Sequence, residues 1–298
     1  MIVHTHTDML RMLFTLRGSV VKRIAWRCLM VTLLAALIVL VERHYPAFFY
    51  PVSATPFTLL GLSLSIFMSF RNNACYDRWW EGRKAWGRMI IEVRSFVRES
   101  VVITDPAQRA SLLRSLCGFA HGLNARLRGE DDAQAAAPWL AQGAAISPHN
   151  VCDGILRHIG EQCARLASEQ RIGEFRYMTL EQRLVGLSEV QATCERIKGT
   201  PLPFPYTLLL HRTIYIFCLL LPFALAEPLG WLAPLFTTIV SYTFLGLDAI
   251  GNELEDPFGR DENDLPTDAL VRMIERDVLS ALGEPLPAVL EPVEHVLS

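Results

Sequence analysis

Four apolar segments stand out along the chain, at residues 24–41, 52–70, 206–226 and 231–250. A helix needs about 20 apolar residues to cross the hydrocarbon core of a membrane, or slightly fewer with flanking anchors. The pattern therefore predicts four transmembrane helices. The first segment is followed by ERHYPAFFY, which lacks a small-residue cleavage site and is typical of an aromatic interfacial belt, so we interpret it as a membrane span and not as a signal peptide.

Basic residues gather on one side of these spans. They precede the first span and follow the second, whereas the two short connections on the other side carry Arg43 and Glu227. Positively charged loops stay in the cytosol. We therefore expect both termini and region 71–205 to be cytosolic. The expected domains are 1–70 with the first two spans, 71–205 as a cytosolic helical domain, 206–250 with the last two spans, and 251–298 as a cytosolic C-terminal segment.

The cytosolic part has a helical pattern. No proline occurs in 57–104, so the second span is predicted to continue as one unbroken helix of about 48 residues, which is about 70 Å long. Apolar positions at helical spacing predict further helices at 106–127, 148–169 and 180–197, and 129–148 is predicted as a loop or short helix. No segment has a strand pattern. The predicted class is all-α, a four-span membrane protein with a helical cytosolic domain.

Composition agrees with a membrane protein. The chain has 298 residues, 51% of them hydrophobic and 20% charged, with a net charge of −3. This apolar content exceeds what one soluble core of this size needs, and no basic tract indicates a nucleic acid partner. The seven cysteines contain no Cys-x-x-Cys pair, so a disulfide framework is not expected. Two weak metal candidates remain, a set at Cys152, His158 and Cys163 and a set at His4, His6 and Asp8.

The most distinctive segment is RNNACYDRWWEGRKAWG at 71–87, directly after an uncharged span. Its mixture of Asn, Arg, Asp and Trp fits a tightly hydrogen-bonded helix junction, and it fits an interfacial anchor of aromatic and basic residues equally well. A second distinctive segment, DPFGRDENDLP at 256–266, follows the fourth span.

These two segments, placed as they are relative to four spans, resemble the bestrophin family. The residues that carry the family signature are Arg71, Asn72, Asn73, Tyr76, Asp77, Arg78, Trp79, Trp80, Glu81 and Gly82. The resemblance implies a homopentamer around one ion pathway with an apolar neck on the second span. In this sequence the neck would be Leu62, Ile66 and Phe70, which share one helical face. Without the resemblance, the same stripe is explained by lipid or core contacts.

The resemblance implies two further features. One is a second constriction at the cytosolic mouth, for which Leu180 is the candidate, although Leu180, Leu184 and Leu187 also form a good core stripe. The other is a calcium clasp, which would place its ligands at Glu253, Asp256, Asp261 and Asp264. Calcium prefers hard oxygen ligands. The run departs from the family pattern at Asn263 and Arg260, so an acidic linker before a helix that starts near Pro266 is the alternative, and no cofactor is required.

The predicted function is a channel for small monovalent ions in the inner membrane of a bacterium, assembled from copies of this chain and surrounded by lipid. The uncharged neck gives no selectivity. The compact chain looks prokaryotic, and prokaryotic members of the family are associated with cations, so cations are favoured over anions. One alternative is a metal-dependent intramembrane enzyme such as a prenyl transferase, which would use Asn73 and Asp77 with Asp261 and Asp264. Another is a non-conducting membrane scaffold.

Overall fold

A computed structural model describes residues 1–2, 18–45, 53–143 and 146–298. The long helices are α2 (Val21–His44), α3 (Thr55–Glu99), α4 (Pro106–Leu127), α6 (Val151–Ser168), α7 (Glu174–Gly199), α8 (Phe204–Leu229), α9 (Ala233–Glu255) and α10 (Thr267–Leu282). Shorter ones are α5 (Asp132–Ala136), η2 (Ser100–Val102), η3 (Ala137–Trp139) and η4 (Gly230–Leu232). Within the described ranges, β pairing is limited to isolated bridges of Val296 with Ile2 and Val293. The predicted all-α class is confirmed.

The helices form two compact units. One unit, which we call the apolar bundle, contains α2, α3 as far as Trp79, α8 and α9. The other, which we call the polar bundle, contains α3 from Trp80 onward, α4 to α7, and α10. The predicted domain limits concern the membrane surface, which these contacts do not test, so they stay predictions.

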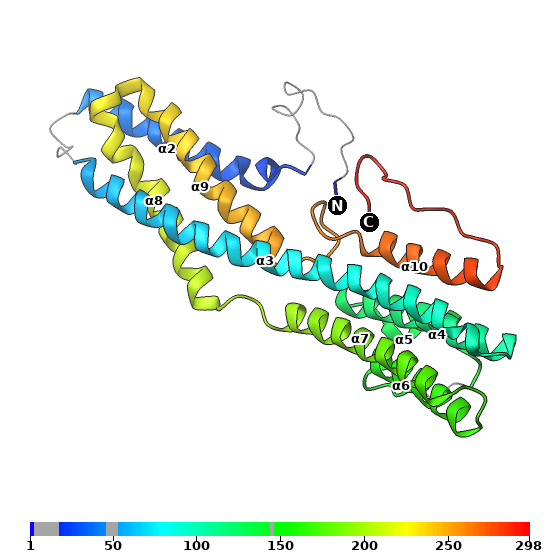
Figure 1. The fold of residues 1–298 in the computed structure, drawn as a ribbon. Coiled ribbons are helices and arrows are strands. Elements are labelled where there is room, and N and C mark those ends of the chain that lie inside the picture. The colour runs from blue at the N-terminus through cyan, green and yellow to red at the C-terminus, as the bar shows by residue number, and fades with distance from the viewer. Residues whose placement is uncertain (3–17, 46–52, 144–145) are drawn as a thin grey trace. The chain divides into compact units, whose positions relative to one another are not determined.

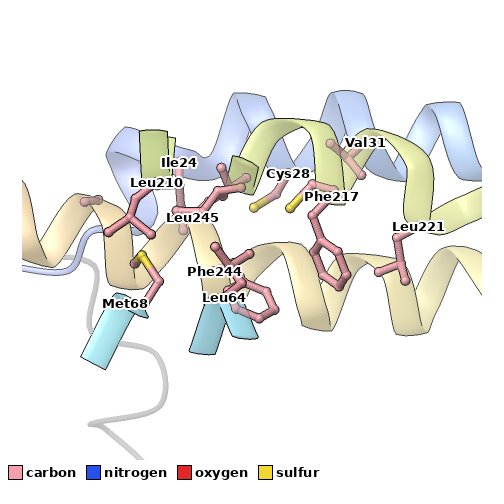
Figure 2. Close-up of a cluster of buried hydrophobic side chains, with 13 residues drawn as sticks. Ile24, Cys28, Val31, Leu64, Met68, Leu210, Phe217, Leu221, Phe244 and Leu245 are labelled. Carbon is pink, nitrogen blue, oxygen red and sulfur yellow. The ribbon is translucent and has the colours of Figure 1, made fainter. Parts of the chain in front are cut away.

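The apolar bundle is held together by aliphatic and aromatic side chains from all four of its helices. Figure 1 shows α2, α8 and α9 side by side. Figure 2 shows the cluster at their centre, where Leu64 of α3 lies near Phe244 of α9 and Met68 of α3 lies near Leu210 of α8. Gly61 lets α3 approach α8 closely, because a Cβ atom there would lie 3.2 Å from Phe217 Cζ. One face of α3 is therefore fixed inside this bundle.

Two segments among the described residues are long and apolar enough to cross a membrane. They are Val21–His44, which is α2, and Phe204–Glu255, which comprises α8, η4 and α9. The second segment contains both the third and the fourth predicted spans. The second predicted span is not among the two, because its described helical part covers only residues 55–70 and is followed directly by Arg71 and Asn72.

The polar bundle folds from helices whose ends carry clear signals. Asp105 accepts the backbone N–H groups of Ala107 and Gln108 at the start of α4, and α10 ends at Gly283 with φ of +71°. A side-chain N-cap and a left-handed glycine C-cap are both common at helix termini. Trp86 and Phe96 of α3 are fully buried here. The α3 side of this unit is thus a core element as well.

Most predicted helix limits are confirmed. α3 continues to Glu99 and η2 extends the turn to Val102, so a single helix of 45 residues, about 68 Å long, replaces the predicted 48. α4 begins and ends at the predicted residues. The largest difference is α7, which begins at Glu174 and not at 180. Gly173 precedes it, and the buried apolar pattern that predicts its start does not extend to the first turn, where Phe175 is exposed.

Candidate functional site

α3 presents two opposite faces within the apolar bundle. Leu64 and Met68 are buried against the other helices. Leu62, Ile66 and Phe70 are 61%, 48% and 61% exposed. At about 100° of rotation per residue, the exposed stripe is centred roughly 180° from the buried face. The predicted neck residues therefore share one face and lie outside the core of their own subunit.

An exposed face of this kind needs an explanation. Soluble proteins rarely leave contiguous apolar surface in water, so such a face contacts lipid, another subunit or a hydrophobic constriction. Leu59, one turn before Leu62, is also exposed and extends the stripe. Ser63, Ser65 and Ser69 are exposed on neighbouring positions, where small side chains allow close helix contact.

Directly after Phe70, α3 is anchored to α9 by a buried arginine. The Arg71 side chain is 0% exposed, and its Nη1 lies 3.0 Å from Asp248 Oδ1. Its Nη2 donates to Asn252 Oδ1 at 2.5 Å and lies 3.7 Å from Glu255 Oε2. A buried guanidinium is costly unless carboxylate and carbonyl oxygens surround it. These groups satisfy Nη1 and Nη2, whereas the buried Nε has no hydrogen-bond partner among the described residues.

The anchor extends to α8 and to the next residue of α3. Asp248 Oδ2 lies 2.9 Å from His211 Nδ1, so one buried carboxylate joins α3 and α8. Asn72 Nδ2 donates to Leu247 O at 3.2 Å. Gly251 makes this approach possible, because a Cβ atom there would lie 2.6 Å from Asn72 Oδ1. The helix-junction interpretation of the signature segment holds for Arg71 and Asn72.

Other signature residues are distributed differently. Arg78 Nε donates to Glu255 O at 3.1 Å, and Glu81 pairs with Arg196 at 2.6 Å. Gly82 accommodates Phe258, whose ring lies 3.1 Å from a Cβ atom placed there. Asn73, Tyr76, Asp77 and Trp80 are exposed, and Trp79 is half-buried. The signature thus divides into a buried anchoring part and an exposed part.

Sequence reasoning missed the partners of Arg71. Asp248, Asn252 and Glu255 lie at or just beyond the end of the fourth predicted span, and none was selected. A signal was present, because a carboxylate inside an apolar span is costly without a cation nearby.

The structure corrects the prediction that Leu180 forms a cytosolic constriction. Its side chain is 0% exposed, in the core of the polar bundle on α7. A residue buried among its own subunit's helices cannot contact ions in a pathway, so the core alternative for the stripe Leu180, Leu184 and Leu187 is the correct one.

Three of the predicted calcium ligands contact other groups of the protein. Glu253 pairs with Arg23 at 3.3 Å. Asp256 pairs with Lys198 at 2.6 Å. Asp264 is buried and accepts the Asp261 backbone N–H at 2.7 Å. No group of three or more His, Cys, Asp or Glu side chains with metal-binding geometry occurs in the described part of the chain.

The environment of Asp264 has an electrostatic consequence. Burial raises the pKa of its carboxyl group to about 6, the Asp261 N–H opposes this rise, and the carboxylates of Asp261 and Asp256 add to it. Asp264 therefore stabilises the turn before α10 through its bond to the Asp261 N–H. α10 begins at Thr267, close to the start near Pro266 that the acidic-linker alternative predicts.

The two weak metal candidates gain no support. Cys152 and Cys163 are buried, and burial raises the pKa of each thiol to about 12, which disfavours the thiolate that a metal needs. His4, His6 and Asp8 lie outside the described residues.

Comparison with known proteins identifies the family. Residues 1–280 match the family described as Bacterial/Fungal Bestrophin protein. The voltage-dependent anion channel-forming protein mll4386 of Mesorhizobium japonicum is 43% identical over 296 residues, 97% of this chain and 95% of that protein. The voltage-dependent anion channel-forming protein YneE of Escherichia coli is 38% identical over 300 residues, 99% of each chain.

Solved structures agree with the sequence relatives. A crystal structure of a bacterial bestrophin homologue from Klebsiella pneumoniae is 33% identical with a TM-score of 0.83. The match covers 88% of this chain and 99% of that one.

These findings bear on the functional alternatives. They support an ion channel and not an enzyme. The names of these relatives specify anions, so the predicted preference for cations is not supported. With four helices in its apolar bundle, a buried arginine anchor after the neck stripe and relatives that match nearly its whole length, the chain belongs to the bacterial/fungal bestrophin family.

Proposed function

We propose that the chain is one subunit of a homopentameric channel for small monovalent ions, in which α3 lines the pathway and Leu62, Ile66 and Phe70 form its apolar neck. The observation that carries the proposal is the exposure of this stripe opposite a buried face. When copies of α3 meet around an axis, each residue of the stripe forms an apolar ring. Such rings conduct only when wetted, which makes the neck a physical gate.

The anchor at Arg71 supports the same arrangement. A gate needs its ring residues held at fixed positions, and Arg71 follows Phe70 immediately. Its bonds to Asp248 and Asn252 fix the rotation of α3 about its axis, so the stripe keeps its direction. The buried pair is thus a positioning device for the neck.

Anions are the first permeant ions to test, because the relatives are named as anion channel-forming proteins. The neck cannot discriminate by sign, since its three residues are uncharged. Selectivity therefore depends on charged groups elsewhere along the pathway.

The proposed location is the inner membrane of a bacterium, with both termini in the cytosol. The basic residues that follow α3's exposed stripe, beginning with Arg71, support this orientation. Protease cleavage of a C-terminal tag in inverted but not right-side-out vesicles tests it.

The test of function is reconstitution of the purified chain into liposomes under KCl and NaCl gradients, with reversal potential as the readout. Cysteine at Ile66 should make the current sensitive to charged thiol reagents. Phe67 provides a matched control, because it is 51% exposed but lies about 100° around the helix. No flux under any gradient would refute the channel, and equal sensitivity of I66C and F67C would refute this neck.

Subunit number is tested separately. Native mass spectrometry in detergent should give five times the 33.5 kDa mass of the chain. A mass equal to a different multiple of the chain would refute the pentamer and would leave the pore-lining role of α3 unaffected.

A further inference from the structure

The exposed face of α3 does not end at the neck. Asp77 lies seven residues after Phe70 on the same unbroken helix. Seven residues turn an α-helix by about 700°, which is about 20° short of two full turns, and advance it by about 10 Å. Asp77 therefore points in nearly the same direction as Phe70, two turns farther along.

Asp77 also differs from the other charged residues nearby. Arg71 is buried against Asp248, and Arg78 donates to the Glu255 carbonyl oxygen. Asp77 is exposed, and no hydrogen bond or ion pair joins it to another described residue. Asn73, between it and Phe70, is likewise exposed. Among the described residues, no partner neutralises the charge of the Asp77 carboxylate.

A charged residue in this position has no structural explanation within the apolar bundle. It stabilises no helix end, since α3 continues to Glu99, and it does not contribute to the core. The alternative is a merely solvated side chain, which would have no influence on permeating ions. Asp77 shares its direction with the neck stripe, and this favours contact with permeating ions over a merely solvated side chain.

We propose that Asp77 is an ion-contacting residue that sets the balance between cations and anions directly beyond the neck. The inference rests on the proposed function, because it takes the stripe of Leu62, Ile66 and Phe70 as pore-lining. Each subunit then contributes one carboxylate to a ring around the pathway. A channel that passes anions does so against the field of this ring, and basic groups elsewhere on the pathway must then supply the preference.

The expected effect follows from Coulomb's law. One unit charge about 8 Å from an ion in a water-like dielectric changes the ratio of cations to anions by about fivefold. Screening in about 0.1 M salt reduces this to about twofold. Neutralising every copy in the ring should therefore shift the cation-to-anion permeability ratio by at least about twofold toward anions.

The test uses the full-length chain in liposomes or planar bilayers with asymmetric KCl. Asp77→Asn should shift the permeability ratio toward anions, and Asp77→Lys should shift it further in the same direction. Asp77→Glu keeps the charge and should keep the wild-type ratio. Glu227→Gln removes an exposed carboxylate of α8 that likewise has no partner among the described residues, and it should leave the ratio unchanged.

The outcomes separate this inference from the proposed function. If wild-type protein carries no current, the channel itself fails. If I66C is blocked by thiol reagents and the Asp77 variants keep the wild-type ratio, the channel stands and the role of Asp77 is refuted. If Asp77→Asn dissociates the oligomer, Asp77 serves a contact between subunits, and the inference is refuted as well.

Discussion

Replacing Asp248 by asparagine tests the anchor of the pore helix. The change keeps the shape of the side chain and removes the charge that faces Arg71 Nη1 at 3.0 Å. Arg71 is fully buried, and it would retain Asn252 and a carboxylate of Glu255 at 3.7 Å. Removing one partner of a buried ion pair typically costs about 3–5 kcal/mol, because the remaining charge loses its nearest counter-charge.

The assay is thermal unfolding of the purified protein in detergent. In a chain of this size about 1 kcal/mol corresponds to a shift of about 2–4 °C, so Asp248→Asn should lower the melting temperature by at least about 6 °C. Asp277→Asn is the matched control, because it breaks the Arg94–Asp277 pair at 2.7 Å, where both side chains are partly hydrated. Exposed pairs contribute about 1 kcal/mol or less.

A double replacement makes the reasoning refutable. Arg71→Met together with Asp248→Leu removes both charges and should unfold at a higher temperature than Asp248→Asn alone, since no charge is left buried. If Asp248→Asn and Asp277→Asn melt at the same temperature, or if the double variant shows the sum of two independent losses, the pair is not the anchor described here.

Three further predictions concern the same helix and the turn before α10. Ile66→Ala should raise single-channel conductance by widening the neck, and it should change the melting temperature by less than about 2 °C because Ile66 is 48% exposed. Gly251→Ala should destabilise by about 1–3 kcal/mol in thermal unfolding, because its Cβ atom would lie 2.6 Å from Asn72 Oδ1 and 3.0 Å from Arg71 Nη1. The pKa of Asp264 is raised to about 6 from an ordinary value of 3.8, so its folded form holds a proton more tightly than its unfolded form. The Asp264 carboxyl group therefore stabilises the fold at low pH, and this contribution is lost as pH rises through about 6. The melting temperatures of wild type and Asp264→Asn are compared at pH 5 and pH 7. If both proteins show the same change between these pH values, the prediction is wrong.

The helices were largely predictable because each depends on local pattern. α4 starts after Asp105 with proline at its first position, and these two residues mark the start of the helix without any tertiary information. α3 was predicted as one helix because no proline interrupts it, and the structure has it unbroken from Thr55 to Glu99. Local signals of this kind fix an element and leave its partners open.

The anchor could not be predicted in the same way. Arg71 and Asp248 are 177 residues apart in the chain, and no spacing rule links residues at that distance. The motif was compatible with a hydrogen-bonded helix junction without showing which residues would be its partners. Leu180 failed for a related reason, because a leucine stripe at helical spacing has the same pattern whether it faces a pathway or a core.

The composition of α3 distinguishes an apolar surface that faces a pore from one that faces lipid. The apolar part of α3 in the described residues is 55–70 and ends directly at Arg71, whereas α2 and the α8–α9 segment are apolar over longer stretches. A helix that contacts lipid on its exposed side needs apolar residues around most of that side. On the exposed side of α3 the apolar residues are interrupted by Ser63 and Ser69, whose hydroxyl groups would contact lipid poorly. Such a helix is stable in a membrane when other copies of α3 cover its serine positions, and the Leu62, Ile66 and Phe70 stripe is then left to face the axis between them.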